Sequence, residues 1–152
     1  MKFRLNSPRC SVANNIKDLS QFYIKMDNIK TTKILLVDDE PNILIALEFL
    51  FEKEGYIVQT AFDGHQAIQK ADAFRPDIMV LDVMMPGIDG FEVAKRLRNM
   101  LNFDNLRIIF LTAKGTTNDR MKGYSSGGEI YLTKPFDNDE LVQTVREIVE
   151  FG

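Results

Sequence analysis

The sequence has no tryptophan, a single cysteine and no long apolar run. One cysteine cannot form an intrachain disulfide, which excludes a disulfide-stapled secreted scaffold and favours the cytoplasm. No apolar stretch reaches the ~18 residues that a membrane span needs, so a transmembrane protein is excluded. Hydrophobic residues make up 45% and charged residues 27% of the 152 positions, as in ordinary folded domains. The sequence therefore predicts one globular domain with an appendage.

Positive charge is concentrated near the N-terminus. Residues 1–32 carry six Lys/Arg and two Asp, a net charge of +4, whereas residues 33–152 have a net charge of −7. A surface that binds nucleic acid without sequence preference needs a cationic face to displace counterions. We therefore expect no direct nucleic-acid binding, and no membrane partner.

The first 25 residues show neither the period of a strand nor that of a helix, and they lack the apolar core of a secretory signal. Met26 opens a string that leads directly into the first apolar run. We predict that residues 1–31 are a disordered extension, that Met26 is the natural start, and that residues 32–151 form the domain.

From residue 33 onwards, short apolar runs alternate with segments of helical periodicity. Five runs are rich in β-branched or aliphatic residues: 34–37, 57–61, 78–81, 108–111 and 130–133. Helices are predicted after Pro41, Asp63, Gly90 and Asp137, with a weak one near residues 118–126. Five such units in about 120 residues predict an α/β domain: a parallel sheet with helices on both faces.

Polar side chains end most of these strands, and in a doubly wound sheet the carboxyl ends of the strands form the ligand site. The residues in question are Asp38, Asp39, Asp82, Thr112 and Lys134. Three carboxylates at one rim repel one another unless a cation joins them, and hard oxygen ligands favour Mg²⁺. A metal ion, a lysine and a hydroxyl around a carboxylate form a cradle for a phosphoryl group, and the carboxylate can act as its nucleophile.

Four strings carry a family resemblance: KILLVDDEPN, DIMVLDVMMPGIDG, IIFLTA and YLTKPF. Over residues 32–151 the chain resembles the receiver domain of two-component response regulators, as in single-domain chemotaxis receivers. The resemblance implies a flavodoxin-like, doubly wound sheet of five parallel strands in the order 2-1-3-4-5, with five helices.

The resemblance also implies roles for the residues at the rim. Asp82 is expected to accept the phosphoryl group, and Lys134 to contact its oxygens. Asp38 and Asp39 are expected to position Mg²⁺ together with Asp82 and the backbone carbonyl of Met84.

Two further residues are expected to report the phosphorylation. Thr112 matches the switch hydroxyl, and Tyr131 matches the aromatic residue that turns inward on activation. The resemblance also implies a cis peptide bond between Lys134 and Pro135. The output face would be formed by the fourth helix, fifth strand and fifth helix.

We therefore expect a cytoplasmic, single-domain response regulator that takes its phosphoryl group from a histidine kinase or a histidine phosphotransfer protein. It would act on a downstream protein partner, as a monomer or as a phosphorylation-dependent dimer. Its role is signalling, and it would be no enzyme beyond its own phosphorylation and dephosphorylation.

Three other functions share parts of this pattern. A phosphohydrolase with an Asp nucleophile usually has a second acid two residues on, but Val83 and Met84 follow Asp82. A flavin-binding module needs a hydroxyl-rich loop after the first strand, where this chain is acidic and would repel a flavin phosphate. A docking module of the same fold that works without phosphorylation is the third.

Overall fold

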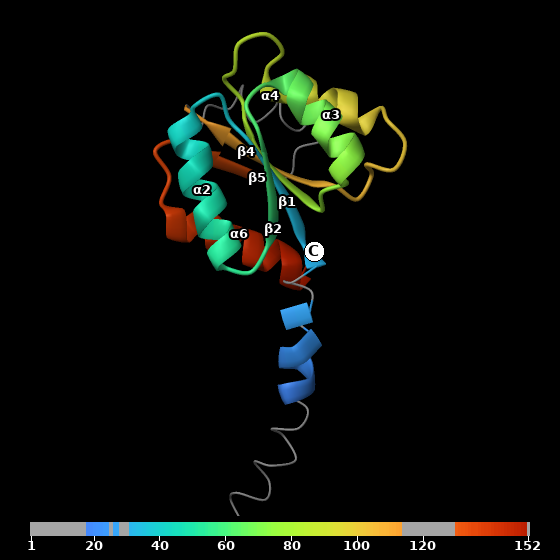
Figure 1. Ribbon diagram of the computed structural model, residues 1–152, viewed down its shortest axis with the longest axis vertical. Helices are drawn as coiled ribbons and strands as arrows, with labels where there is room; N and C mark the ends of the chain where they lie inside the picture. Colours follow the sequence, from blue (N-terminus) through green and yellow to red (C-terminus); the bar gives the residue numbers. More distant parts are fainter. Residues whose placement is uncertain (1–17, 25, 28–30, 114–129, 152) are drawn as a thin grey trace, which may run out of the picture.

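The structure is a computed structural model that describes residues 18–24, 26–27, 31–113 and 130–151. Its centre is a sheet of five parallel strands in the order β2-β1-β3-β4-β5 (Figure 1). The strands are β1 (Lys33–Val37), β2 (Ile57–Ala61), β3 (Ile78–Asp82), β4 (Arg107–Thr112) and β5 (Ile130–Thr133). The predicted α/β fold class and strand order are confirmed.

The described helices of the domain are α2 (Pro41–Lys53), α3 (Gly64–Phe74), α4 (Gly90–Arg98) and α6 (Asn138–Phe151). The predicted helix starts hold: Pro41 is at the first helical turn, and the Asp63 carboxylate accepts a hydrogen bond of 2.7 Å from the Gln66 N–H. The fourth predicted helix, near residues 118–126, lies outside the described residues. Among the described residues, no helix combines the length and apolar character needed to cross a bilayer.

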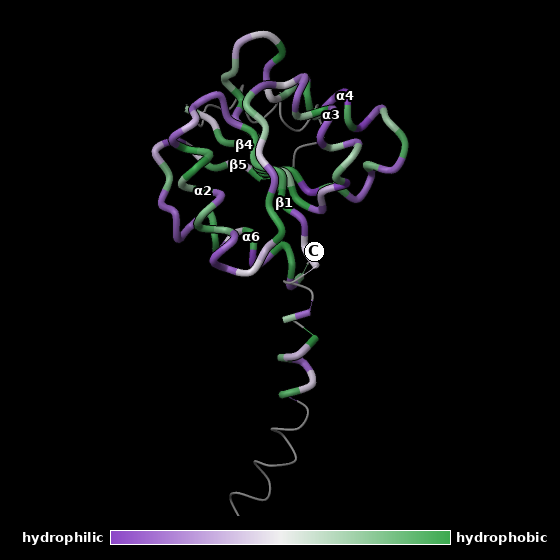
Figure 2. The backbone as a smooth tube through the Cα atoms, viewed as in Figure 1, coloured by the Kyte–Doolittle hydropathy of each residue, from purple (hydrophilic) through white to green (hydrophobic). Residues whose placement is uncertain are grey.

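The apolar strands are buried on both faces because helices cover both sides of the sheet. Leu35 and Val37 point into a core with α3 and α4, whereas Ile34 and Leu36 point into a second core with α2 and α6. Successive side chains of a strand alternate between the two faces, so one strand feeds both cores. Figure 2 shows the same strands as hydrophobic segments in the middle of the molecule.

The turn after β3 fixes where α4 begins. A Cβ atom at Gly90 would lie 2.5 Å from the Asp82 carbonyl oxygen, so the helix start packs against the strand end and requires glycine there. The Asp89 carboxylate caps the helix by accepting a 2.9 Å hydrogen bond from the Glu92 N–H. The end of β3, which carries Asp82, is thereby held on a short, well-packed turn.

Helical residues precede the domain, where the sequence predicts no regular element. Residues 18–24 and 26–27 are helical, and all of them are exposed. Figure 1 shows this segment leading away from the body at the end of the sheet where β1 begins.

Candidate functional site

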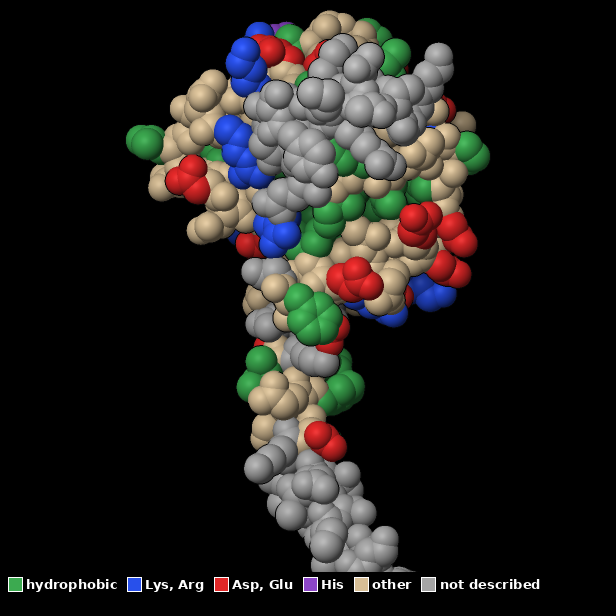
Figure 3. Space-filling view, turned by 180° about the vertical axis from the view of Figure 1, so that it is seen from behind, with side chains coloured by type: hydrophobic (Ala, Val, Ile, Leu, Met, Phe, Trp, Pro, Cys, Tyr) green, Lys and Arg blue, Asp and Glu red, His purple; other side chains and the backbone are tan. Residues whose placement is uncertain are grey.

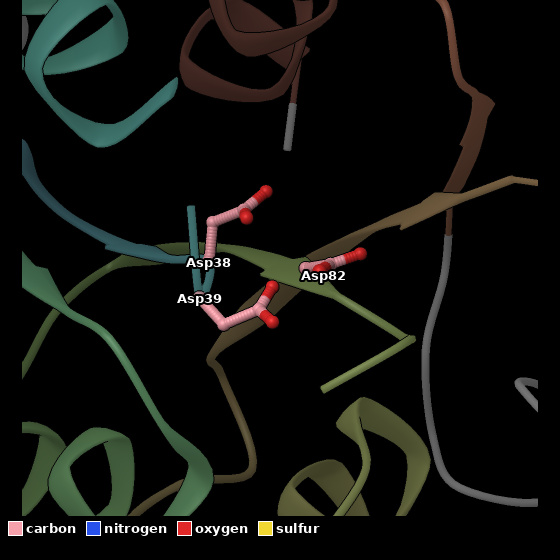
Figure 4. Close-up of side chains that lie close together, drawn as sticks. All are labelled: Asp38, Asp39 and Asp82. Atoms are coloured by element: carbon pink, nitrogen blue, oxygen red, sulfur yellow. The ribbon is translucent and has the colours of Figure 1, made fainter. Parts of the chain in front are cut away.

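Three carboxylates converge at the carboxyl ends of the two central strands. Asp38 and Asp39 directly follow β1, and Asp82 is the last residue of β3. Because Val37 pairs with Leu81 in the parallel ladder, the two strand ends lie side by side. One carboxylate oxygen from each residue lies within 4.8 Å of the other two, and Figure 4 shows the three side chains around one space.

Two of these acids are buried, although a charged carboxylate is costly to remove from water. Asp38 is 1% exposed and Asp82 is 3% exposed, while Asp39 faces solvent. One Asp38 oxygen accepts a hydrogen bond of 2.9 Å from the Glu40 N–H, which turns the chain from β1 into α2.

Lys134 follows the edge strand β5 and supplies positive charge to these two buried acids. Its Nζ lies 2.9 Å from Oδ2 of Asp38 and 3.3 Å from Oδ1 of Asp82. The lysine follows β5, and its own N–H donates a hydrogen bond to the Thr112 carbonyl at the end of β4. The peptide bond between Lys134 and Pro135 is cis, as the resemblance implies.

Burial and the neighbouring acid raise the pKa of Asp82 to about 6. Desolvation is the larger cause and the charge of Asp38 adds to it, while Lys134 and the Met84 N–H partly offset both. Burial alone would lower the pKa of Lys134, but its hydrogen bond to Asp38 and the charges of Asp82 and Asp38 outweigh that effect and raise it. The amine is therefore firmly cationic, whereas Asp82 holds its charge less readily than an ordinary aspartate.

The donor set fits a hard divalent cation. Three carboxylate oxygens at this mutual distance can share one ion, and Mg²⁺ takes oxygen ligands while keeping several waters. The open side next to exposed Asp39 leaves room for those waters.

The metal contact predicted at Met84 is made by its backbone carbonyl, and its side chain is exposed. The hydrogen bond from its N–H to Asp82 places its peptide unit beside the carboxylates. The predicted metal contact of its carbonyl remains a prediction.

Thr112 and Tyr131 lie on the two strands beyond Asp82. Thr112 ends β4 and is 2% exposed. Tyr131 lies on β5, and its ring stacks on Phe110 with centroids 5.4 Å apart and an angle of 28° between the planes. Phe110 in turn meets Phe91 edge-to-face at 5.0 Å. The structure thus brings the predicted acids and lysine together directly and places the two predicted switch residues on the adjoining strands.

The sequence reasoning missed two features. Phe110 was a core position in the apolar pattern, and its stacking on Tyr131, like its edge-to-face contact with Phe91, depends on tertiary packing. A groove of about 420 Å³ beside the site was also missed. It is lined by Ile43, Ala46, Leu47, Lys134, Pro135, Phe136 and Asn138, and it forms where α2 meets the chain between β5 and α6.

Comparisons with known proteins agree on the class of this domain. The family model described as "Response regulator receiver domain" matches residues 34–146. The chain is 45% identical over 118 residues to the "Alkaline phosphatase synthesis transcriptional regulatory protein PhoP" of Bacillus subtilis, covering 77% of this chain and 48% of that one. It is 39% identical over 117 residues to the "DNA-binding dual master transcriptional regulator RpaA" of Synechocystis, again covering 77% and 48%.

Solved structures agree as well. The chemotaxis protein CheY4 of Vibrio cholerae matches with a TM-score of 0.75 at 32% identity, covering 78% of this chain and 98% of that one. TrrA of Thermotoga maritima, solved in complex with Mg²⁺ and a beryllium fluoride, matches with a TM-score of 0.68 at 36% identity, covering 78% and 99%. The chain belongs to the family of response regulator receiver domains of two-component systems, which are signalling proteins.

The expectation about partners needs a correction. We expected no nucleic-acid partner, but the relatives are named as transcriptional regulators and one of them as DNA-binding. The chain spans about half the length of these relatives. The net charge describes only this domain, whereas the relatives named as regulators are about twice its length.

Proposed function

We propose that this domain accepts a phosphoryl group on Asp82 from a phosphohistidine, and that Mg²⁺ supports the transfer. The observation that carries the proposal is the position of the Asp82 carboxylate. It is buried within reach of Lys134, beside two further acids whose oxygens complete a site for a hard cation. An aspartate with a purely structural role at a strand end would need neither the nearby lysine nor the two further acids.

The transfer exchanges one bond for another. An Asp82 oxygen forms a bond to phosphorus while the bond between phosphorus and the imidazole nitrogen breaks, and the departing imidazole takes up a proton. Lys134 would neutralise charge on the phosphoryl oxygens, since its Nζ already lies 3.3 Å from Asp82. Mg²⁺ held by Asp38, Asp39 and Asp82 would offset the remaining negative charge.

The groove beside the site supports a protein as the donor. Its walls are mostly apolar and Lys134 lies at its edge, so a partner helix could dock there and present a histidine to Asp82. A histidine kinase or a histidine phosphotransfer protein has this chemistry. Because the histidine of such donors receives its phosphoryl group from ATP, we place the reaction in the cytoplasm.

Thr112 and Tyr131 would change position when Asp82 is phosphorylated. Thr112 ends the strand next to Asp82, so its hydroxyl could bond a phosphoryl oxygen after a small movement of the β4 end. Tyr131 stacks against the same strand through Phe110, which couples a shift of β4 to the surface at β5. The phosphorylated domain would thereby present a changed face around β5 to its target.

The experiment is intact-mass analysis after incubation with acetyl phosphate, with Mg²⁺ or with a chelator. We expect the wild type to gain one phosphoryl group only with Mg²⁺, and Asp82→Asn to gain none. Asp72→Asn, which removes an exposed carboxylate elsewhere, is the matched control and should behave as the wild type. A gain in Asp82→Asn, or none in the wild type, would contradict the proposal.

The relatives favour a second candidate for the output, namely control of transcription. Their names and their length argue for a longer protein in which a further domain binds DNA. The mass of the protein isolated from its native source separates this candidate from an output through a protein partner of the domain alone. The same mass tests whether translation starts at Met26.

A further inference from the structure

The loop after Asp82, residues 83–89, joins β3 to α4 and carries the Met84 peptide beside the acids. Two hydrogen bonds of 3.0 Å close its base: the Val83 N–H donates to the Leu111 carbonyl, and the Gly90 N–H donates to the Val83 carbonyl. Between these bonds the loop is mostly exposed. Its shape therefore depends on the few side chains that it buries.

Two side chains of the loop pack into the core. Met85 is 8% exposed and Ile88 is partly buried, and both contact the apolar cluster between the sheet and helices α3 and α4. Ile88 also lies directly against the first residue of α3. A Cβ atom at Gly64 would overlap Cγ1 of Ile88 and lie 2.8 Å from its Cδ1. The isoleucine therefore occupies the space that a side chain at position 64 would fill.

The chain between β2 and α3 gives Ile88 a rigid surface to pack on. The Gln66 N–H donates a 2.7 Å hydrogen bond to the Asp63 carboxylate, and the Gln66 side-chain oxygen accepts a 2.9 Å hydrogen bond from the Phe62 N–H. Gln66 thus ties both residues before Gly64 to the first turn of α3. The position of Gly64, which is buried, is fixed independently of the loop that packs on it.

The same stretch of chain contacts the opposite half of the acidic site. Ala61, the last residue of β2, is fully buried, and its carbonyl accepts a 3.2 Å hydrogen bond from the Asp38 N–H. Residues 61–64 therefore contact Asp38 at one end and, through Gly64 and Ile88, the loop after Asp82 at the other. This short bridge fixes the position of that loop relative to the acid that follows β1.

Such precision matters for the expected cation. Mg²⁺ demands near-ideal octahedral geometry at about 2.0–2.1 Å, so a displaced ligand weakens binding. The predicted carbonyl ligand belongs to Met84, whose side chain is 69% exposed and gives its peptide little anchorage. The direction of that carbonyl therefore depends on how the rest of the loop is held.

We propose that Ile88 is a positioning residue for Mg²⁺, because its packing on Gly64 holds the loop in the shape that presents the Met84 carbonyl to the ion. The inference rests on the function proposed above, since it concerns the same metal site. Ile88 would act through the loop backbone, because its own side chain is apolar and offers no ligand atom.

A Mg²⁺ titration reports on this site. Among the residues that the structure describes, Asp38, Asp39 and Asp82 form the one group of acids close enough to share an ion. On the face drawn in Figure 3, acidic side chains lie at several separate places, some of them beside Lys or Arg. A single surface carboxylate holds Mg²⁺ weakly, because this ion gives up its waters reluctantly.

The test compares Mg²⁺ affinity, measured by calorimetric titration, with stability, measured by denaturant unfolding in a chelator. Ile88→Ala should weaken Mg²⁺ binding about tenfold, as loss of a residue that supports metal ligands does. Ile68→Ala is the matched control, because Ile68 is also partly buried against the same core. Both variants should lose similar stability, but Ile68→Ala should bind Mg²⁺ as the wild type does. Equal affinities in the two variants would overturn the proposal.

A second set of variants tests the contact with Gly64. Gly64→Ala should also weaken Mg²⁺ binding, because the added methyl group displaces Ile88. Adding Ile88→Ala should restore part of that affinity, since the methyl group then fills vacated space. Ile88→Val, which keeps a branched side chain against Gly64, should bind nearly as the wild type does. If the losses of Gly64→Ala and Ile88→Ala simply combine in the double variant, Ile88 does not act through Gly64 and the proposal is wrong.

The wild type separates this proposal from the function on which it rests. If the wild type binds no Mg²⁺, the proposed function fails and the role of Ile88 fails with it. If the wild type binds Mg²⁺ and Ile88→Ala binds it equally well, only the role of Ile88 is wrong.

Discussion

Lys134 and Asp38 lie 96 positions apart in the sequence, yet the lysine Nζ is 2.9 Å from a carboxylate oxygen of the aspartate. The contact spans the sheet from the end of β5 to the end of β1, and Asp82 lies within the same reach. One amine therefore balances two buried acids before any cation binds. This arrangement makes the site both a functional centre and a part of the fold's stability.

Lys134→Met should impair both roles. Removing one partner of a buried ion pair leaves an uncompensated charge, which costs about 3 kcal/mol of unfolding free energy at neutral pH in the absence of Mg²⁺. Denaturant unfolding measures this loss, and the rate of phosphorylation by acetyl phosphate should fall by at least about tenfold. Lys95→Met, at an exposed position of α4, is the control. Equal losses in the two variants would show that the position of Lys134 has no special role.

Asp82→Asn should stabilise the metal-free protein at neutral pH. The folded protein raises the pKa of Asp82 from 3.8 to about 6, so protonated Asp82 favours the folded state. That contribution is complete below the unfolded pKa and is lost as the pH rises through about 6. The asparagine should therefore add about 1–2 kcal/mol at about pH 7.5, less than the full shift implies because the site opens to solvent beside Asp39.

The pH dependence of this gain is the measurement. Denaturant unfolding with a chelator present should show the advantage of Asp82→Asn shrinking towards about pH 4. Asp72→Asn, which removes an exposed carboxylate away from the site, is the control for an Asp-to-Asn change as such. A gain that grows as the pH falls has the wrong sign and would refute the account of Asp82.

Mg²⁺ should stabilise the domain through the three carboxylates. Binding to the folded state alone adds about 2.7 kcal/mol at a hundredfold excess over the dissociation constant, which appears as a rise in Tm. Asp39→Asn should reduce this rise, since it removes the exposed ligand without leaving a buried charge unpaired. An unchanged Mg²⁺ response in that variant would place the ion elsewhere.

The stacking of Phe110 on Tyr131 should couple the site to the surface. Phe110→Leu removes the stack, whereas Phe51→Leu alters an equally buried phenylalanine that contacts Tyr56 in the other core. Both should cost about 1–2 kcal/mol of stability. Only Phe110→Leu should change how the NMR signals of the Tyr131 ring respond to phosphorylation, and the same change in Phe51→Leu would remove the case for a specific path.

The sheet and the positions of the acids could be predicted from the sequence because both depend on local patterns. Runs such as residues 34–37 are apolar throughout only when both faces are covered, which predicts a parallel sheet with two helical layers. Asp38, Asp39 and Asp82 end strands, and parallel strands bring their carboxyl ends to one edge.

Other features depend on distance rather than on pattern. The stacking of Tyr131 on Phe110 arises from the register of β4 against β5, which no local signal fixes. The expectation about nucleic acid was wrong because the net charge of this domain describes only its own surface.

Phosphotransfer should convert Asp82 into an aspartyl phosphate. Borohydride reduces an aspartyl phosphate to homoserine, so peptide mass spectrometry after treatment with acetyl phosphate, Mg²⁺ and borohydride identifies the acceptor directly. We expect homoserine at position 82 and unchanged aspartate at positions 38 and 39. Homoserine at either of those positions, or at none in a protein that has gained a phosphoryl group, would contradict it.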